Sequence, residues 1–335
     1  MVGHALPWPF LPKLKKGARK NMKYKHSKLL SSGYLKVSDT HELYFEERGS
    51  KSGIPLIFIH GGPGGGFSKS AEYFFNPRKF HYILFDQRGV GRSKPFLETK
   101  DNDIFQIVDD IEKIRKHFGF TKIWLFGGSF GSTIALTYAI CYPEHTAGML
   151  IRGIFLARQE DCDWLYSGAQ NFYWLEYKEF IAEIGDTKKV ADIVPEYLKK
   201  ITSTDKAISD RASLKWANYE LSLVFPIKRP ELLATQATNS ERQIALMESF
   251  FFANKTFSKD DNYILTNIHK AAHIPTYIVH GRYDMVCPLK QAYLVHEAIP
   301  GSKLTVVELG GHASSHKPTF KAIQKYLKEI IKNSK

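Results

Sequence analysis

Short runs rich in β-branched and aromatic residues alternate with helical patterns along most of the chain. Several of these runs, such as residues 56–59, are continuously apolar, which indicates strands buried on both faces and hence a mainly parallel sheet covered by helices. Strands are predicted at 34–37, 41–49, 55–62, 82–89, 123–129, 147–154, 275–281 and 303–310. Helices are predicted at 104–118, 131–141, 289–299 and 319–331. The pattern therefore predicts an α/β fold.

The alternation of strand and helix patterns ends between residues 157 and 270, where strand patterns disappear, helical spacing dominates and aromatic residues accumulate. This stretch separates two predicted sheet strands, so it is expected to be an inserted helical domain over the carboxyl edge of the sheet. The predicted division is a core of residues 31–156 and 271–335 and a cap of residues 157–270.

The composition predicts a basic N-terminal extension, residues 1–30, in addition to the core and the cap. Residues 1–30 hold eight lysines and arginines and no acid, although the whole chain of 335 residues has a net charge of only +13. Such a segment binds nucleic acid or an anionic membrane in some proteins, but a solvated extension is the commoner outcome, and no nucleic-acid partner is expected. Cysteines 141, 162 and 287 have no spacing typical of disulfide frameworks or zinc sites, and no apolar run reaches the length of a membrane span. A cytoplasmic protein is expected.

A glycine-rich turn carries the first candidate for chemistry. Gly127-Gly128-Ser129-Phe130-Gly131 closes a predicted strand and opens a predicted helix. In the pattern G-x-S-x-G the serine backbone is strained and the glycines avoid collisions with the adjoining strand and helix, so that the hydroxyl is presented at a helix N-terminus. The pentapeptide also arises as an ordinary turn, so the rest of a catalytic group must be sought.

A serine nucleophile requires a general base, usually histidine, and a carboxylate that orients it. Asp284 follows the predicted strand 275–281, and His312 follows the predicted strand 303–310. Ser129, Asp284 and His312 thus occur in the order serine, acid, histidine and are expected at one edge of a parallel sheet. His280 and His316 are competing bases, but the first lies inside a strand and the second lies further from a strand end.

Acyl transfer also requires donors for the developing oxyanion. One predicted donor is the backbone N–H of Phe130, the residue after the serine. The other is predicted in the glycine-rich loop of residues 60–66, with Gly62 preferred and Gly61 as the alternative. A phosphate-binding loop is disfavoured because no G-K-[ST] sequence follows and Pro63 lacks an N–H.

The motifs together resemble those of the prolyl aminopeptidases, or proline iminopeptidases. The matching stretches are HGGPGGG (60–66), DQRGVGRS (86–93), GGSFGS (127–132), HGRYD (280–284) and GGHA (310–313), and the resemblance extends over residues 31–335. It implies an α/β-hydrolase fold with a mostly parallel, eight-stranded sheet and a helical cap. It also implies release of an N-terminal proline from peptides through an acyl-enzyme, without a metal or organic cofactor. Within the second stretch, Arg88 is expected to be structural and bound to nearby carboxylates or carbonyls.

The resemblance further implies two cap glutamates, Glu220 and Glu248, that bind the free α-ammonium of the substrate. Helical spacing places Glu220 on the face of Trp216 and Glu248 on an apolar face, where a carboxylate needs a partner. An internal arginine or lysine would serve as well as a substrate ammonium.

The chain also departs from the family's pattern. It has phenylalanine at 130 and tyrosine at 219, where the family often has tryptophan, and Phe250-Phe251 replaces a His-Tyr pair. These changes leave the shape of the proline pocket open. A carboxylesterase with the same triad and a non-catalytic α/β scaffold whose basic extension recruits nucleic acid or membrane are the alternative functions.

Overall fold

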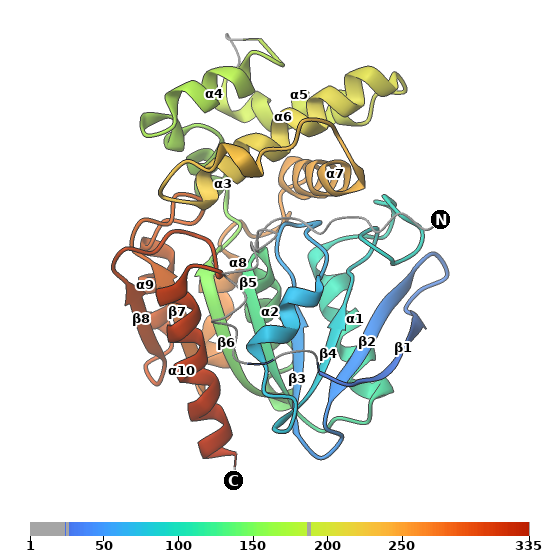
Figure 1. The fold of residues 1–335 in the computed structure, drawn as a ribbon, viewed down its shortest axis with the longest axis vertical. Coiled ribbons are helices and arrows are strands. Elements are labelled where there is room, and N and C mark those ends of the chain that lie inside the picture. The colour runs from blue at the N-terminus through green and yellow to red at the C-terminus, as the bar shows by residue number, and fades with distance from the viewer. Residues whose placement is uncertain (1–23, 25–26, 186–188, 335) are drawn as a thin grey trace.

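The sheet has eight strands in the order β1-β2-β4-β3-β5-β6-β7-β8 (Figure 1). The computed structural model describes residues 24, 27–185 and 189–334, so most of the basic extension predicted at 1–30 lies outside the described residues. β2 pairs antiparallel with both β1 and β4, and the remaining pairs are parallel. The strands are β1 Leu29–Lys36, β2 Glu42–Gly49, β3 Ile54–Ile59, β4 Phe80–Phe85, β5 Ile123–Ser129, β6 Thr146–Ile154, β7 Thr276–Gly281 and β8 Lys303–Val307.

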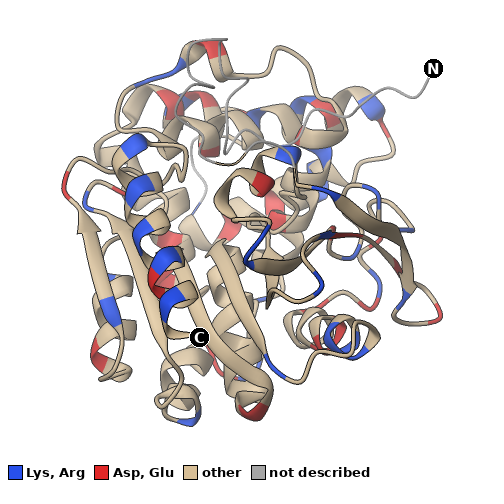
Figure 2. Cartoon of the chain, turned by 60° about the horizontal axis from the view of Figure 1, so that its bottom comes forward, with Lys and Arg blue, Asp and Glu red and all other residues tan. Residues whose placement is uncertain are grey.

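Helices cover both faces of the sheet. On one face lie α1 Ile104–His117, α2 Phe130–Cys141 and α9 Lys290–Ala298, and on the other lie the short 3₁₀ helix η2 Lys69–Phe74 and α10 Lys317–Asn333. Neighbouring residues of one strand, such as Leu56 and Ile57, therefore belong to different apolar clusters. This explains the continuous apolar runs, since strands buried on both faces need apolar residues at successive positions. The lysines of α10 are exposed on its outer side (Figure 2).

A helical layer lies over the carboxyl ends of the parallel strands (Figure 1). It consists of α3 Gln159–Tyr166, α4 Trp174–Ile181, α5 Val190–Ile201, α6 Lys206–Val224 and α7 Asn239–Ala253, with the 3₁₀ helices η4 Gly168–Asn171 and η5 Pro230–Leu232. The following α8 Tyr263–Asn267 and η6 Ile268–Ala271 already pack on α2, and η3 Pro143–His145 precedes β6. α7 begins with a capping box in which Thr238 and Glu241 bind each other's backbone N–H. Among the described residues, no helix is long and apolar enough to cross a bilayer.

Candidate active site

The serine predicted as nucleophile occupies a strained turn. Ser129 ends β5 and caps α2 with φ 57° and ψ −134°, a conformation that few non-glycine residues adopt. A Cβ atom at Gly127 would lie 2.2 Å from the carbonyl oxygen of Gly131, and one at Gly131 would lie 2.4 Å from that of Ile59. The strand and the helix therefore approach as closely as the G-x-S-x-G pattern predicts.

Asp284 and His312 are brought together by the loops after β7 and β8. Nδ1 of His312 donates to Oδ2 of Asp284 over 2.8 Å, and both side chains are buried. This bond leaves Nε2 of His312 as the nitrogen that can accept a proton. His280, the first competing base, accepts at Nδ1 from the backbone N–H of Ile154, and its Nε2 is hydrogen-bonded to the carbonyl of Cys287. Both of its ring nitrogens are therefore used in hydrogen bonds to the backbone. His316 lies just before α10.

The Asp284 carboxyl is held ionised although it is 4% exposed. Burial alone would raise its pKa, but the neighbouring His312 and His280 and the backbone N–H of Cys287 bring the pKa below its ordinary value. Oδ1 accepts from the N–H groups of Val286 and Cys287 at 3.1 and 2.8 Å. Asp284 therefore has the properties of a carboxylate that orients a histidine and stabilises its charged form.

One pocket joins the core and the cap. Its lining comes from the ends of five strands and from three cap helices, and comprises Gly62, Ser129, Phe155, Leu165, Glu220, Val224, Glu248, Phe252, Val286 and His312. Of the two predicted oxyanion donors, Gly62 belongs to this lining and Phe130 is the first residue of α2, directly after the serine. Their role in binding an oxyanion stays a prediction.

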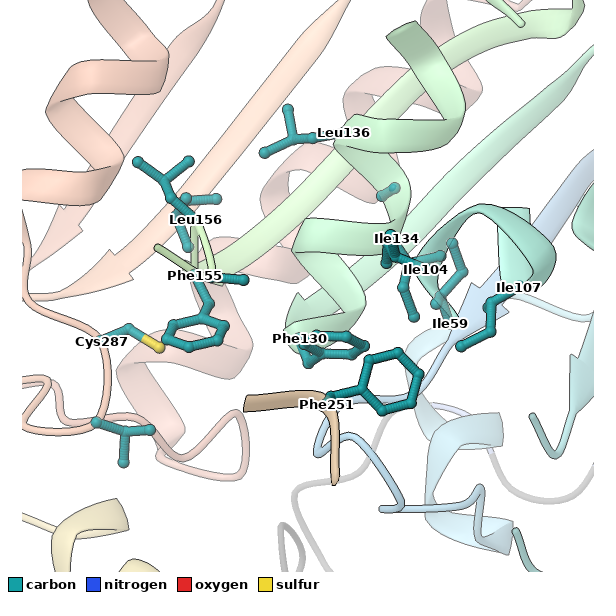
Figure 3. Packing of buried hydrophobic residues seen from close by; sticks show 14 of the residues in the cluster. Ile59, Ile104, Ile107, Phe130, Ile134, Leu136, Phe155, Leu156, Phe251 and Cys287 are labelled. Carbon is teal, nitrogen blue, oxygen red and sulfur yellow. The ribbon is translucent and has the colours of Figure 1, made fainter. Parts of the chain in front are cut away.

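The side chain of Phe130 is not part of the pocket lining. It is completely buried and packs edge-to-face on Phe251, with ring centroids 5.3 Å apart (Figure 3). Tyr219 likewise stacks on Phe180 and donates to the carbonyl of Leu165. Neither residue contributes to the pocket lining. Phe130 and Tyr219, the two positions at which the family often has tryptophan, therefore pack behind the residues that line the pocket.

Glu220 on α6 and Glu248 on α7 face each other in this pocket. Their carboxyl groups are hydrogen-bonded to one another. Glu220 also accepts from the hydroxyl of Tyr166 at 2.5 Å, and Glu248 accepts from the indole N–H of Trp216 at 2.6 Å. Tyr166 is a functional neighbour that the sequence did not reveal, because nothing in its local pattern distinguishes it from the other aromatic residues of the cap.

The pKa values of both glutamates are raised. Burial raises the pKa of Glu220, and it raises the pKa of Glu248 well above the ordinary value together with the charge of Glu220. Within residues 27–185 and 189–334, no lysine or arginine acts on either carboxyl. The alternative of an internal cation is therefore not realised in the described part of the chain. A hydrogen bond between two carboxyls requires a proton on one of them, and the stronger rise in pKa favours Glu248 as the donor.

A thiol lies beside the catalytic candidates. Ligand atoms of Asp284, Cys287 and His312 lie within 4.8 Å of one another, a spacing compatible with a metal ion. However, Asp284 and His312 use their facing atoms to bind each other. Burial raises the pKa of the Cys287 thiol well above its ordinary value, and the Ser129 hydroxyl is hydrogen-bonded to it. The thiol thus stays protonated and is no competing nucleophile. The expectation of a metal-free site stays a prediction.

The structural role predicted for Arg88 is confirmed. Its guanidinium forms a bidentate pair with Asp110 on α1, with N–O distances of 2.6 and 2.8 Å, and it also donates to the side chain of Gln106. This pair ties the loop after β4 to the first helix of the core.

Comparison with known proteins shows the family to which the chain belongs. Residues 54–317 match the family model of the α/β hydrolase fold. A proline iminopeptidase of Arabidopsis thaliana is 39% identical over 85% of this chain and 76% of its own length. A proline iminopeptidase of Neisseria meningitidis serogroup A is 38% identical over 90% of this chain and 96% of its own length. The chain belongs to the proline iminopeptidase family of α/β hydrolases.

Solved structures agree on the fold of this family member. An esterase from Exiguobacterium antarcticum superposes with a TM-score of 0.61 over 90% of this chain and all of the esterase, at 21% sequence identity. The likeness at this identity concerns the fold alone. The predicted α/β-hydrolase fold and the resemblance to proline iminopeptidases are both confirmed.

Proposed function

We propose that this protein is a serine exopeptidase that releases N-terminal proline from peptides. The observation that carries the proposal is the pair of Glu220 and Glu248, which lines the same pocket as Ser129 and His312 and has no counter-cation in the described part of the chain. A buried anionic pair without a cation binds a cationic ligand group well, since the ligand replaces the missing counter-charge. The names of the relatives agree with a proline substrate.

The catalytic cycle follows from these positions. Oγ of Ser129 attacks the carbonyl carbon of the proline while Nε2 of His312 accepts the hydroxyl proton, and Asp284 stabilises the imidazolium. Backbone N–H groups of Gly62 and Phe130 bind the oxyanion, each contributing about 3 kcal/mol to transition-state stabilisation. His312 then gives the proton to the leaving amine. Water hydrolyses the prolyl ester of Ser129 by the same route, which releases proline and regenerates the serine.

The glutamate pair makes the reaction specific for the first residue of a peptide. An N-terminal proline carries a secondary ammonium with two N–H donors and one positive charge. The pair with its single proton carries one negative charge, so the bound state is neutral. An N-acetylated proline has neither the charge nor an N–H, and it leaves the buried carboxyls without a donor. Sites of this kind reject such analogues by a factor of about 10⁴ to 10⁵.

The test compares Pro-naphthylamide with N-acetyl-Pro-naphthylamide and with short p-nitrophenyl esters. We expect rapid hydrolysis of the first substrate and none of the second. Equal turnover of both naphthylamides would contradict amine recognition. Efficient hydrolysis of the esters with no cleavage of Pro-naphthylamide would identify a carboxylesterase instead. Labelling of Ser129 by a fluorophosphonate, absent in Ser129→Ala, tests the nucleophile separately and addresses the non-catalytic alternative.

Two further parts of the proposal concern partners and location. The partners are peptides with a free N-terminal proline. The three cysteines are free, with Cys141 exposed and the other two buried. Free thiols fit a reducing compartment, and we propose the cytoplasm. Fractionation of cells with antibody detection of the protein tests this location.

A further inference from the structure

A buried arginine lies beneath the nucleophile turn. Arg152 on β6 is aligned with Gly128 on the neighbouring strand β5, and it is only 8% exposed. A Cβ atom at Gly128 would lie 2.2 Å from Nε of Arg152 and 2.6 Å from its Cζ. The guanidinium therefore lies against the α-carbon of Gly128, next to Ser129, in space that any other residue at 128 would fill.

The other end of the guanidinium reaches the loop of the base. Nη1 of Arg152 donates to the carbonyl oxygen of His312 over 2.9 Å. The backbone N–H of His312 donates to the carbonyl of Val224 at the end of α6, over 3.1 Å. His312 is thus held by its backbone on both sides and by its ring through Asp284. One rigid side chain spans the distance between the nucleophile turn and the histidine loop.

We propose that Arg152 is a positioning residue that sets the distance and orientation of His312 relative to Ser129. The planar, always charged fork of arginine suits this task, because it makes a directed hydrogen bond while its face packs flat on a backbone. A displacement of about 1 Å between reacting groups costs on the order of 100-fold in rate. Loss of this link is therefore expected to reduce the chemical step rather than substrate binding.

The charge of Arg152 also acts on groups next to the base. The Asp284 carboxylate interacts with the guanidinium, and the same positive charge lowers the pKa of His280 next to Asp284. The titratable and charged groups around His312 are Asp284, His280, Cys287 and Arg152. Among them Arg152 is the permanent cation, and it faces the negative charge of the Asp284 carboxylate.

The experiment compares Arg152→Met, Arg152→Lys and Arg115→Met in the full-length protein. Met removes both the hydrogen bond and the charge, and Lys keeps the charge alone. Arg115 is the matched control, because it is also buried and donates to a backbone carbonyl, but it lies on α1 and binds the segment before β5. Rates are divided by the concentration of sites that react with a fluorophosphonate, so unfolded molecules do not contribute.

For Arg152→Met we expect kcat to fall by about 100-fold and KM for Pro-naphthylamide to stay within about threefold. For Arg152→Lys we also expect a reduced kcat. Arg115→Met should lower stability and change neither kcat nor KM. A wild-type kcat in the lysine or the methionine variant would overturn the proposal, and if the methionine variant fails to fold, the lysine variant still decides it.

This inference rests on the serine mechanism proposed above but not on proline as the substrate. The rate at which a fluorophosphonate acylates Ser129 also depends on His312 and is independent of the amine site. A slower acylation in Arg152→Met, with no hydrolysis of Pro-naphthylamide even by the wild type, would contradict the proposed substrate and support the role of Arg152. An unchanged acylation rate would contradict the role of Arg152 alone.

Discussion

Two buried acidic sites, one in the core and one in the cap, differ in how their charge is balanced. Asp284 lies beside two histidines and two backbone N–H groups, and its pKa lies below the ordinary value. Glu220 and Glu248 are equally buried but have only neutral donors and each other, and their pKa values are raised. The core site is thus electrostatically complete, and the cap site lacks a cation. The difference supports our proposal that the core performs the chemistry and that the cap binds a cationic group of the ligand.

The largest expected effect comes from breaking the core site alone. Ser129→Ala should lower kcat for Pro-naphthylamide by about 10⁶-fold, and Asp284→Asn by about 10⁴-fold through the wrong histidine tautomer. Because the cap site is intact, calorimetry should detect proline amide binding to Ser129→Ala with wild-type affinity. Loss of binding in this variant would show that the two sites are not separable.

Breaking the cap site should have a smaller effect, which falls on different kinetic constants. Glu220→Gln removes the charge that receives the ammonium, and we expect kcat/KM for Pro-naphthylamide to fall by about 100-fold, which corresponds to about 3 kcal/mol. Glu248→Gln imitates the protonated partner and should cost less than about tenfold. Steady-state kinetics of both variants measures this asymmetry.

The control for this pair is Glu112→Gln, which alters a buried glutamate bonded to Arg115 and Tyr138. It should lower stability and leave KM unchanged. Equal losses in Glu220→Gln and Glu248→Gln would contradict the assignment of the proton to Glu248.

The pH dependence of KM provides a further test of the difference between the core site and the cap site. As pH falls through the raised pKa of Glu220, the pair becomes neutral while the substrate remains an ammonium. KM for Pro-naphthylamide should therefore increase on the acidic side, by up to tenfold per pH unit, beginning above the ordinary glutamate value of 4.5. Initial rates at several concentrations and pH values measure it. A KM that stays constant down to pH 4.5 would contradict a raised pKa.

The smallest expected effect concerns stability. A carboxyl with a raised folded-state pKa takes up a proton on folding, so its contribution to the free energy of unfolding decreases as pH rises from 4.5 to the folded-state value. Glu248→Gln lacks this proton. The variant should therefore gain on the wild type by about 1.4 kcal/mol per pH unit in that window. Urea unfolding of both proteins at pH 5, 6 and 7 measures the difference, and a constant difference would contradict the prediction.

The features that sequence predicted well are those encoded within one short segment. The apolar runs located all eight strands, but the run 34–37 covers only the end of β1, which begins at Leu29. The runs 82–89 and 303–310 continue past the ends of β4 at Phe85 and of β8 at Val307. Ser129, Asp284 and His312 were identifiable because each follows its own strand, and parallel strands end at a common edge.

The features that sequence did not reveal depend on contacts between distant segments. Arg152 is one charged residue in an apolar strand, and its role appears only when β5 and β6 are aligned and the loop after β8 is in place. The hydrogen bond between Glu220 and Glu248 requires the crossing of two cap helices. The buried position of Phe130 depends in the same way on Phe251, which is far away in the chain.

One helical turn of α6 connects Glu220 to the loop that carries His312. Glu220 is the residue that we propose binds the substrate amine, and the carbonyl of Val224, four residues later, accepts from the backbone N–H of His312. Because a helix is rigid over one turn, a poorly fitting first residue that displaces Glu220 also displaces the anchor of the base. Discrimination between amino acids should therefore appear in turnover as well as in affinity, so that a wrong residue can be bound and still be left uncleaved.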